Sequence, residues 1–168
     1  YCGTFSKIIA PGLRVGYAIA PTALLDKMVV AKQCNDVHTA VLSQIICCQF
    51  LQSCNMAGHL GALQKLYRGK CELMVQGLRQ HLPRASFTAP EGGFFVWCTL
   101  PADIDLMAFV RAAGEAKVAV VPGTTFLPQE NTPCTAVRLN FSAPTNQQIV
   151  EGVERLGRVL FPLGELSK

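Results

Sequence analysis

The chain has 168 residues, of which half are hydrophobic and 15% are charged, and its formal net charge is +4. This composition is typical of a globular protein and excludes a disordered segment. The basic residues are scattered rather than gathered into a stripe, which argues against a nucleic-acid-binding module, and the longest apolar stretch, near residues 40–51, is too interrupted for the roughly 20 residues of a membrane span.

The first third of the chain is predicted to contain one strand and two helices. Residues 13–20 form a nearly continuous apolar run, which favours a strand covered on both faces. Pro11-Gly12 predicts a preceding turn in which the glycine is free to take a positive φ. Helices are expected over residues 21–34 and 39–53, because each begins with a residue that suits a helix N-terminus. The residues expected on the inner side of the first helix are Leu24, Leu25, Met28 and Val29.

A longer helix is predicted over residues 57–82, where apolar residues step by three and four and so form one buried stripe. At 1.5 Å per residue this helix would be about 39 Å long, enough to link two domains. His59 and His81 are expected to be exposed on it. The stripe comprises Leu60, Leu63, Tyr67, Cys71, Met74, Leu78 and Leu82.

The rest of the chain reads as a compact α+β unit. Phe95 and Trp97 are expected in its core. Strands are predicted at residues 86–89, 93–100, 118–121 and 136–141, and helices at residues 105–117 and 145–161. The predicted domain division is a remnant of a large α/β domain over residues 1–55, a linking helix over residues 56–83, and a small C-terminal domain over residues 84–168.

The eight cysteines invite a metal or disulfide interpretation, but they form no C-x-x-C pair and have no nearby histidine at zinc spacing. We therefore predict no metal site. Buried free thiols in a reducing cytosol are the favoured interpretation.

The most informative segment lies near the start of the chain, where Lys7 has small hydroxyl and apolar neighbours. An apolar environment disfavours the charged form of a lysine and leaves an amine that can attack a carbonyl. Thr4, Ser6 and Arg14 add two hydroxyls and a guanidinium, which are suitable donors for a phosphate dianion. A cofactor that carries both an aldehyde and a phosphate would satisfy the lysine and these donors. Pyridoxal 5'-phosphate, held as a Schiff base on Lys7, has both groups.

The run S-K-x-x-x-P-G-x-R-x-G-Y that begins at Ser6 resembles the cofactor-lysine segment of fold-type I pyridoxal-phosphate aminotransferases. The nearest group is the one with 2-aminoadipate, kynurenine and aromatic aminotransferases, together with the aminotransferase-like domains of MocR regulators. Further matching stretches follow in the family's order: Lys32-Gln33 with Asp36-Val37-His38-Thr39, Pro90-Glu91-Gly92-Gly93-Phe94-Phe95-Val96-Trp97, Val121-Pro122-Gly123 and Arg138-Leu139-Asn140-Phe141-Ser142.

The resemblance implies an α/β fold, with part of the large domain of a fold-type I transferase and its α+β small domain. It also implies that Lys7 binds the cofactor and moves a proton between the substrate α-carbon and cofactor C4′, and that Thr4, Ser6 and Arg14 bind the phosphate. The substrates would be an amino acid and a 2-oxo acid, and the protein a cytoplasmic homodimer.

Arg138 stands in an apolar strand, and a buried guanidinium needs a partner. An internal carboxylate is one candidate partner. The resemblance implies another, the α-carboxylate of the substrate.

Three interpretations of the whole chain stay open. The first is a transaminase, and the second is the effector domain of a MocR-like regulator, which an upstream winged-helix domain would reveal. The third is a truncated product that neither binds cofactor nor folds well. Because the chain starts inside what reads as an active-site strand, we expect it to be the C-terminal portion of a longer polypeptide. By itself it is expected to have little or no transaminase activity.

Overall fold

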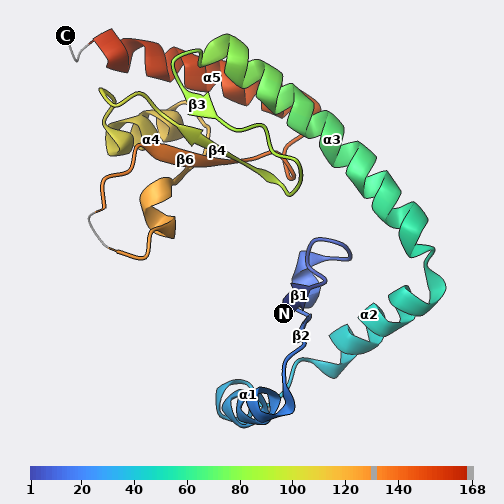
Figure 1. Cartoon of the computed structure of the whole chain (residues 1–168). Coiled ribbons are helices and arrows are strands. Elements are labelled where there is room, and N and C mark those ends of the chain that lie inside the picture. Colours follow the sequence, from blue (N-terminus) through green and yellow to red (C-terminus); the bar gives the residue numbers. More distant parts are fainter. Residues whose placement is uncertain (130–131, 166–168) are drawn as a thin grey trace. The chain divides into compact units, whose positions relative to one another are not determined.

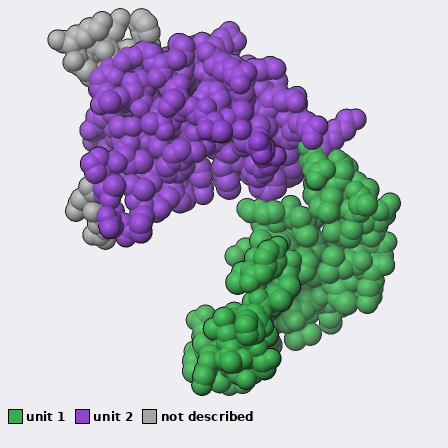
Figure 2. All heavy atoms as spheres, in the orientation of Figure 1, with its two compact units in different colours: residues 1–64 green, residues 65–168 purple. Residues whose placement is uncertain are grey.

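The computed structural model describes residues 1–129 and 132–165. The backbone divides into two compact units, residues 1–64 and residues 65–168 (Figures 1 and 2). Helix α3, Met56–His81, begins in the first unit and continues into the second. The predicted three-part division at residues 55 and 83 stays a prediction.

The first unit consists of a two-stranded ribbon followed by helices (Figure 1). Strands β1 and β2 pair antiparallel, with Gly3 opposite Tyr17. Glycine is required at Gly16, because a Cβ there would lie 2.8 Å from the Gly3 carbonyl oxygen, whereas a Cβ at Gly3 would displace the outer end of the Tyr17 ring. The elements are β1 (Cys2–Thr4), the 3-10 helix η1 (Pro11–Leu13), β2 (Gly16–Ala18), α1 (Thr22–Asn35), α2 (Val41–Ser53) and the start of α3.

Two expectations for this unit are wrong. The strand predicted over residues 13–20 is confined to β2 and is not covered on both faces: Tyr17 is 44% exposed, because β1 is its only paired strand among the described residues. Helix α1 buries none of its residues, and Leu24 and Val29, expected on the inner side, are 53% and 56% exposed. An apolar side chain is buried only where another surface packs on it, and the described part of this unit supplies none there.

The second unit is a four-stranded antiparallel sheet in the order β3-β4-β6-β5, packed against three helices. Its core lies between one sheet face, which carries Val96 and Cys98, and the buried sides of α3, α4 and α5. Met74, Leu78 and Leu82 of the predicted helical stripe are part of that core. The elements are β3 (Ser86–Phe87), β4 (Phe95–Thr99), α4 (Leu106–Glu115), β5 (Val121–Pro122), the 3-10 helix η2 (Gly123–Phe126), β6 (Ala136–Asn140) and α5 (Asn146–Glu165).

Helices α3 and α5 contact each other through glycines. A Cβ at Gly77 would lie 3.1 Å from Val153 Cγ1, and one at Gly157 would lie 2.7 Å from the His81 carbonyl oxygen. Gly61 and Gly69, earlier in α3, are not required for packing, because a Cβ at either position would meet no other atom within 4 Å.

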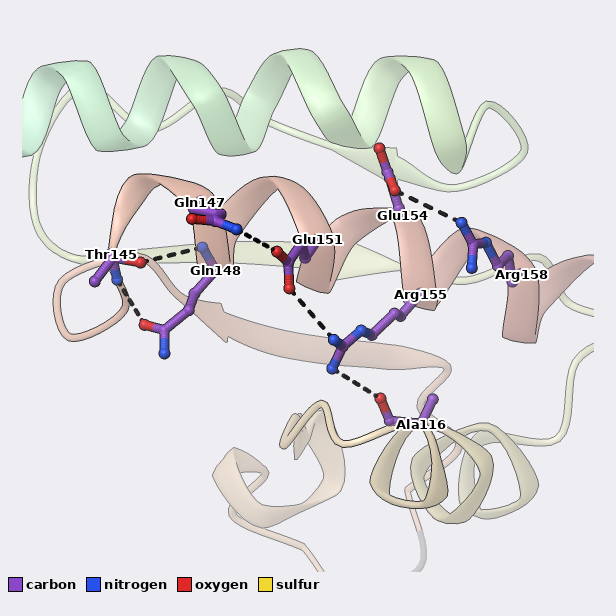
Figure 3. Close-up of polar contacts among 8 residues, drawn as sticks. All are labelled: Ala116, Thr145, Gln147, Gln148, Glu151, Glu154, Arg155 and Arg158. Atoms are coloured by element: carbon purple, nitrogen blue, oxygen red, sulfur yellow. Dashed lines mark hydrogen bonds and ion pairs between the residues drawn. The ribbon is translucent and has the colours of Figure 1, made fainter.

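Helix α5 begins with a capping box, shown in Figure 3. The Gln148 backbone N–H donates to Thr145 Oγ1 at 3.2 Å, and the Thr145 N–H donates to Gln148 Oε1 at 2.8 Å, which satisfies two helix-terminal donors. Further along, Arg155 donates to Glu151 at 3.3 Å and to the Ala116 carbonyl at 3.5 Å, and so links α5 to the end of α4 (Figure 3).

The strand predicted over residues 118–121 is shorter than expected, because α4 ends differently from its prediction. Lys117 takes a φ of 63°, and the Val118 N–H donates back to the Ala113 carbonyl at 2.8 Å. That left-handed residue closes the helix C-terminus, so regular pairing with β6 begins only at Val121.

Candidate active site

Lys7 lies on a tight turn directly after β1. The Phe5 carbonyl accepts hydrogen bonds from the N–H of Ile8 at 3.2 Å and of Ile9 at 2.8 Å, so the backbone on both sides of Lys7 is fixed. The side chain of Lys7 is exposed, while Ile8 and Ile9 are half-buried. The apolar environment expected around Lys7 is therefore not provided by the described residues, although its apolar neighbours are partly buried as expected.

Thr4, Ser6 and Arg14, the predicted phosphate ligands, lie together next to this turn. Thr4 Oγ1 donates to Ser6 Oγ at 3.0 Å and accepts from the Ser6 backbone N–H at 3.1 Å. Arg14 Nη1 donates to Ser6 Oγ at 3.5 Å and to the Pro11 carbonyl at 3.0 Å. Thr4 and Arg14 thus both donate to the Ser6 hydroxyl, and a phosphate oxygen could take its place as their acceptor.

The backbone of Arg14 explains how this cluster forms. Pro11–Leu13 makes one turn of 3-10 helix, and Arg14 follows with a φ of 57°. This left-handed conformation is unfavourable for a residue with a Cβ, and such residues concentrate at functional sites. The positive φ at this turn is taken by Arg14 and not by Gly12, although the glycine was free to take it.

His59, predicted to be an exposed helix residue, contacts the lysine turn. Its Nε2–H donates to the Ile8 carbonyl at 2.7 Å, and its ring packs edge-on against Phe50 at 5.2 Å between centroids. The two hydrogen-bonded residues are 51 positions apart, so no local sequence pattern could have indicated this contact.

Arg138 belongs to the second unit. It lies on β6, opposite Trp97 of β4, on the sheet face that does not carry the core. Its Cζ is 4.2 Å from the centroid of the Phe95 ring and 4.4 Å from that of Phe126. Trp97 is 42% exposed and Phe95 lies on the same face, so the predicted place of both in the core is wrong.

Residues 1–156 match the family model of Aminotransferase class I and II. The chain belongs to this family. The 2-aminoadipate transaminase of Thermus thermophilus is 38% identical over 164 residues, which are 95% of this chain and 40% of that protein. The crystal structure of alpha-aminoadipate aminotransferase from the same organism, complexed with N-(5'-phosphopyridoxyl)-L-leucine, is similar with a TM-score of 0.93 and 36% identity, over 99% of this chain and 42% of that one.

The predicted class I/II aminotransferase resemblance and fold-type I architecture are thus confirmed. The chain spans about two fifths of the length of these relatives. The chain is also similar to a regulator: an uncharacterized HTH-type transcriptional regulator of Escherichia coli is 27% identical over 161 residues, which are 95% of this chain and 34% of that protein.

The eight cysteines are free, but the prediction that they are buried is wrong for most of them. Only Cys47 and Cys98 are fully buried, whereas Cys2, Cys34 and Cys48 are exposed. In the described ranges no cluster of histidine, cysteine and carboxylate side chains could hold a metal ion. No helix in those ranges combines the length and apolar character that crossing a membrane requires.

Proposed function

We propose that this protein is a pyridoxal-5'-phosphate-dependent aminotransferase, which moves an amino group between an amino acid and a 2-oxo acid. The observation that carries the proposal is the cluster of Thr4, Ser6 and Arg14 beside the turn that presents Lys7. Two hydroxyls and a guanidinium suit a phosphate dianion, and an exposed lysine amine on the adjacent turn suits an aldehyde. The donor set therefore fits this cofactor.

The proposed site residues have three roles: binding the phosphate, moving a proton and binding the substrate carboxylate. Arg14, Thr4 and Ser6 hold the phosphate. Lys7 Nζ would hold the cofactor through its aldehyde and would move the proton at the substrate α-carbon. The bound cofactor supplies the electron-accepting ring. Arg138 holds the substrate carboxylate through paired hydrogen bonds, which orients the α-carbon for proton removal. A cytoplasmic homodimer is part of the same proposal.

Borohydride trapping tests the cofactor site. The 168-residue chain is incubated with pyridoxal 5'-phosphate, reduced with borohydride and mapped by mass spectrometry. We expect the label chiefly on Lys7, and inorganic phosphate should compete with it because both anions would occupy the same donors. The Arg14→Gln variant should lower Lys7 labelling at least about tenfold, since a charge-assisted hydrogen bond is lost.

Lys27 on α1 provides the matched control, because it is an exposed lysine of the same unit. Its labelling should respond neither to phosphate nor to Arg14→Gln. Labelling of Lys7 that is no greater than that of Lys27, or that ignores both phosphate and the Arg14 change, would contradict the proposed site.

The regulator interpretation is supported by the Escherichia coli relative, but at 27% identity against 38% for the 2-aminoadipate transaminase. We therefore favour the enzyme. Release of a 2-oxo acid that depends on an added amino acid, measured in the presence of pyridoxal 5'-phosphate, would separate the two, because a sensor would bind the amino acid without turnover.

A further inference from the structure

The Arg138 guanidinium is contacted by two aromatic rings of the second unit. Its Cζ lies over Phe95 at 4.2 Å and over Phe126 at 4.4 Å. Among the described residues, no carboxylate pairs with Arg138 and no oxygen accepts a hydrogen bond from it. The internal carboxylate that the sequence left open is therefore not found in the part of the chain that the structure describes.

Strand register places Phe95 beside the arginine. Trp97 lies directly opposite Arg138 across the β4–β6 pair, and Phe95 lies two residues earlier on the same face. Buried Val96, between them, points to the core. Because side chains alternate along a strand, Phe95 and Arg138 share the face that lacks the core, within diagonal contact distance.

Phe126 reaches the arginine from another element, the short 3-10 helix η2. That helix is held close to the sheet by Gly123, where a Cβ would lie 2.8 Å from the Ala136 carbonyl oxygen and 2.9 Å from the Trp97 ring. Trp97 in turn packs edge-on against Phe126, with 5.8 Å between ring centroids. Gly123 and Trp97 thus determine the position of the Phe126 ring.

We propose that Phe95 and Phe126 are positioning residues that hold the Arg138 guanidinium in one orientation for a carboxylate ligand. Rings over a guanidinium bind its π face and leave its in-plane N–H groups available, so stacking and bidentate carboxylate binding are compatible. The rings also remove water from the cation, which strengthens its hydrogen bonds to an anion. This inference rests on the proposed function, in which Arg138 binds the substrate carboxylate.

The test uses nitrogen-15 NMR of the 168-residue chain, with the Arg138 Nε–Hε signal assigned by its loss in Arg138→Gln. In the wild-type chain we expect an upfield ring-current shift and slow rotation of the guanidinium. Phe95→Leu and Phe126→Leu should each reduce the shift and speed the rotation about two- to fivefold. Titration with acetate should move the signal, acetamide should not, and each leucine variant should weaken acetate binding by a similar factor.

Phe126→Tyr keeps an aromatic ring and should restore both properties, whereas Phe87→Leu, on β3, should leave them unchanged. Phe126 is 43% exposed, so its replacement leaves the buried core intact. Unchanged rotation and acetate affinity in both leucine variants would overturn the positioning role alone. Absence of any acetate effect on wild-type Arg138 would overturn its assignment to a carboxylate, and the positioning role with it, while leaving the Lys7 labelling result unaffected.

Discussion

The Ile8 carbonyl oxygen links the proposed cofactor lysine to the beginning of α3 through a single side chain. Ile8 follows Lys7 directly, and the His59 Nε2–H that reaches it at 2.7 Å is the one side-chain hydrogen bond that the described helix α3 donates to this turn. The Phe50 ring holds the imidazole in place from α2. The turn that carries Lys7 is thus held by backbone hydrogen bonds to the Phe5 carbonyl and by the side-chain hydrogen bond from His59.

Replacing His59 should loosen that turn. In His59→Phe the ring packing is kept but the donor is lost, so amide hydrogen exchange at Ile9 should accelerate about three- to tenfold, the range of a lost net hydrogen bond. His59→Gln offers a donor again and should recover much of the protection. His81→Phe, on the same helix, serves as the control. An unchanged exchange rate in His59→Phe would show that the bond does not hold the turn.

At this scale the sequence was informative wherever the chemistry is local. Thr4, Ser6, Lys7 and Arg14 fall within eleven positions of one another, and the motif alone placed them in one cluster. The contact of His59 depends on how the chain folds back, and the rings beside Arg138 depend on strand register. Neither property follows from the spacing of residues along the chain.

Strand β4 presents opposite chemistry on its two faces. Phe95 and Trp97 face the side that lacks the core, whereas Val96 and Cys98 have no exposed surface. Burial raises the pKa of the Cys98 thiol to about 11. The alternation was predictable, but which face is covered was not, because that depends on where the three helices pack.

The raised pKa of Cys98 makes the stability of the second unit sensitive to alkaline pH. The unfolded chain releases this proton near the thiol's ordinary pKa of 9.0, whereas the folded chain retains it to about 11. Below pH 9 the thiol is protonated in both states and the free energy of unfolding does not depend on its titration. As the pH rises from 9 to 11 the unfolded chain loses the proton first, so the free energy of unfolding falls, by about 2 kcal/mol at pH 11.

Urea unfolding of the wild-type chain and of Cys98→Ala at several pH values checks this. The alanine variant should be less stable at pH 8, because it leaves a small cavity, but its stability should fall less steeply between pH 9 and 11. Parallel pH profiles for the two proteins would contradict the assignment of this effect to Cys98.

On the scale of the whole molecule, the two units differ in how much apolar surface they bury. In the first unit only Val15 and Cys47 are among the buried apolar residues, while Leu42 and Ile45 of α2 are 70% and 52% exposed. The second unit has a continuous core of side chains from the sheet and three helices. The sequence predicted helices in both units, but hydrophobic residues alone could not show which of them have a packing partner within this chain.

Limited proteolysis should reveal that difference. We expect chymotrypsin to cleave within residues 22–53 first, at a rate at least about tenfold higher than within β4 or β6, because local opening costs least where few apolar contacts must be broken. Mass spectrometry of the fragments over time identifies the sites. Equal rates in the two units would mean that α1 and α2 are as stable as the core.

Helix α3 is shared by both units, and the boundary between them falls between Gln64 and Lys65. Gly61 and Gly69 flank that boundary at positions where a side chain would meet nothing. Each glycine lowers the intrinsic preference for helix by about 1 kcal/mol relative to alanine, without any gain in packing. Helix α3 is therefore least stable between these two glycines, and bending it there would require less free energy than bending the stretch that packs on α5.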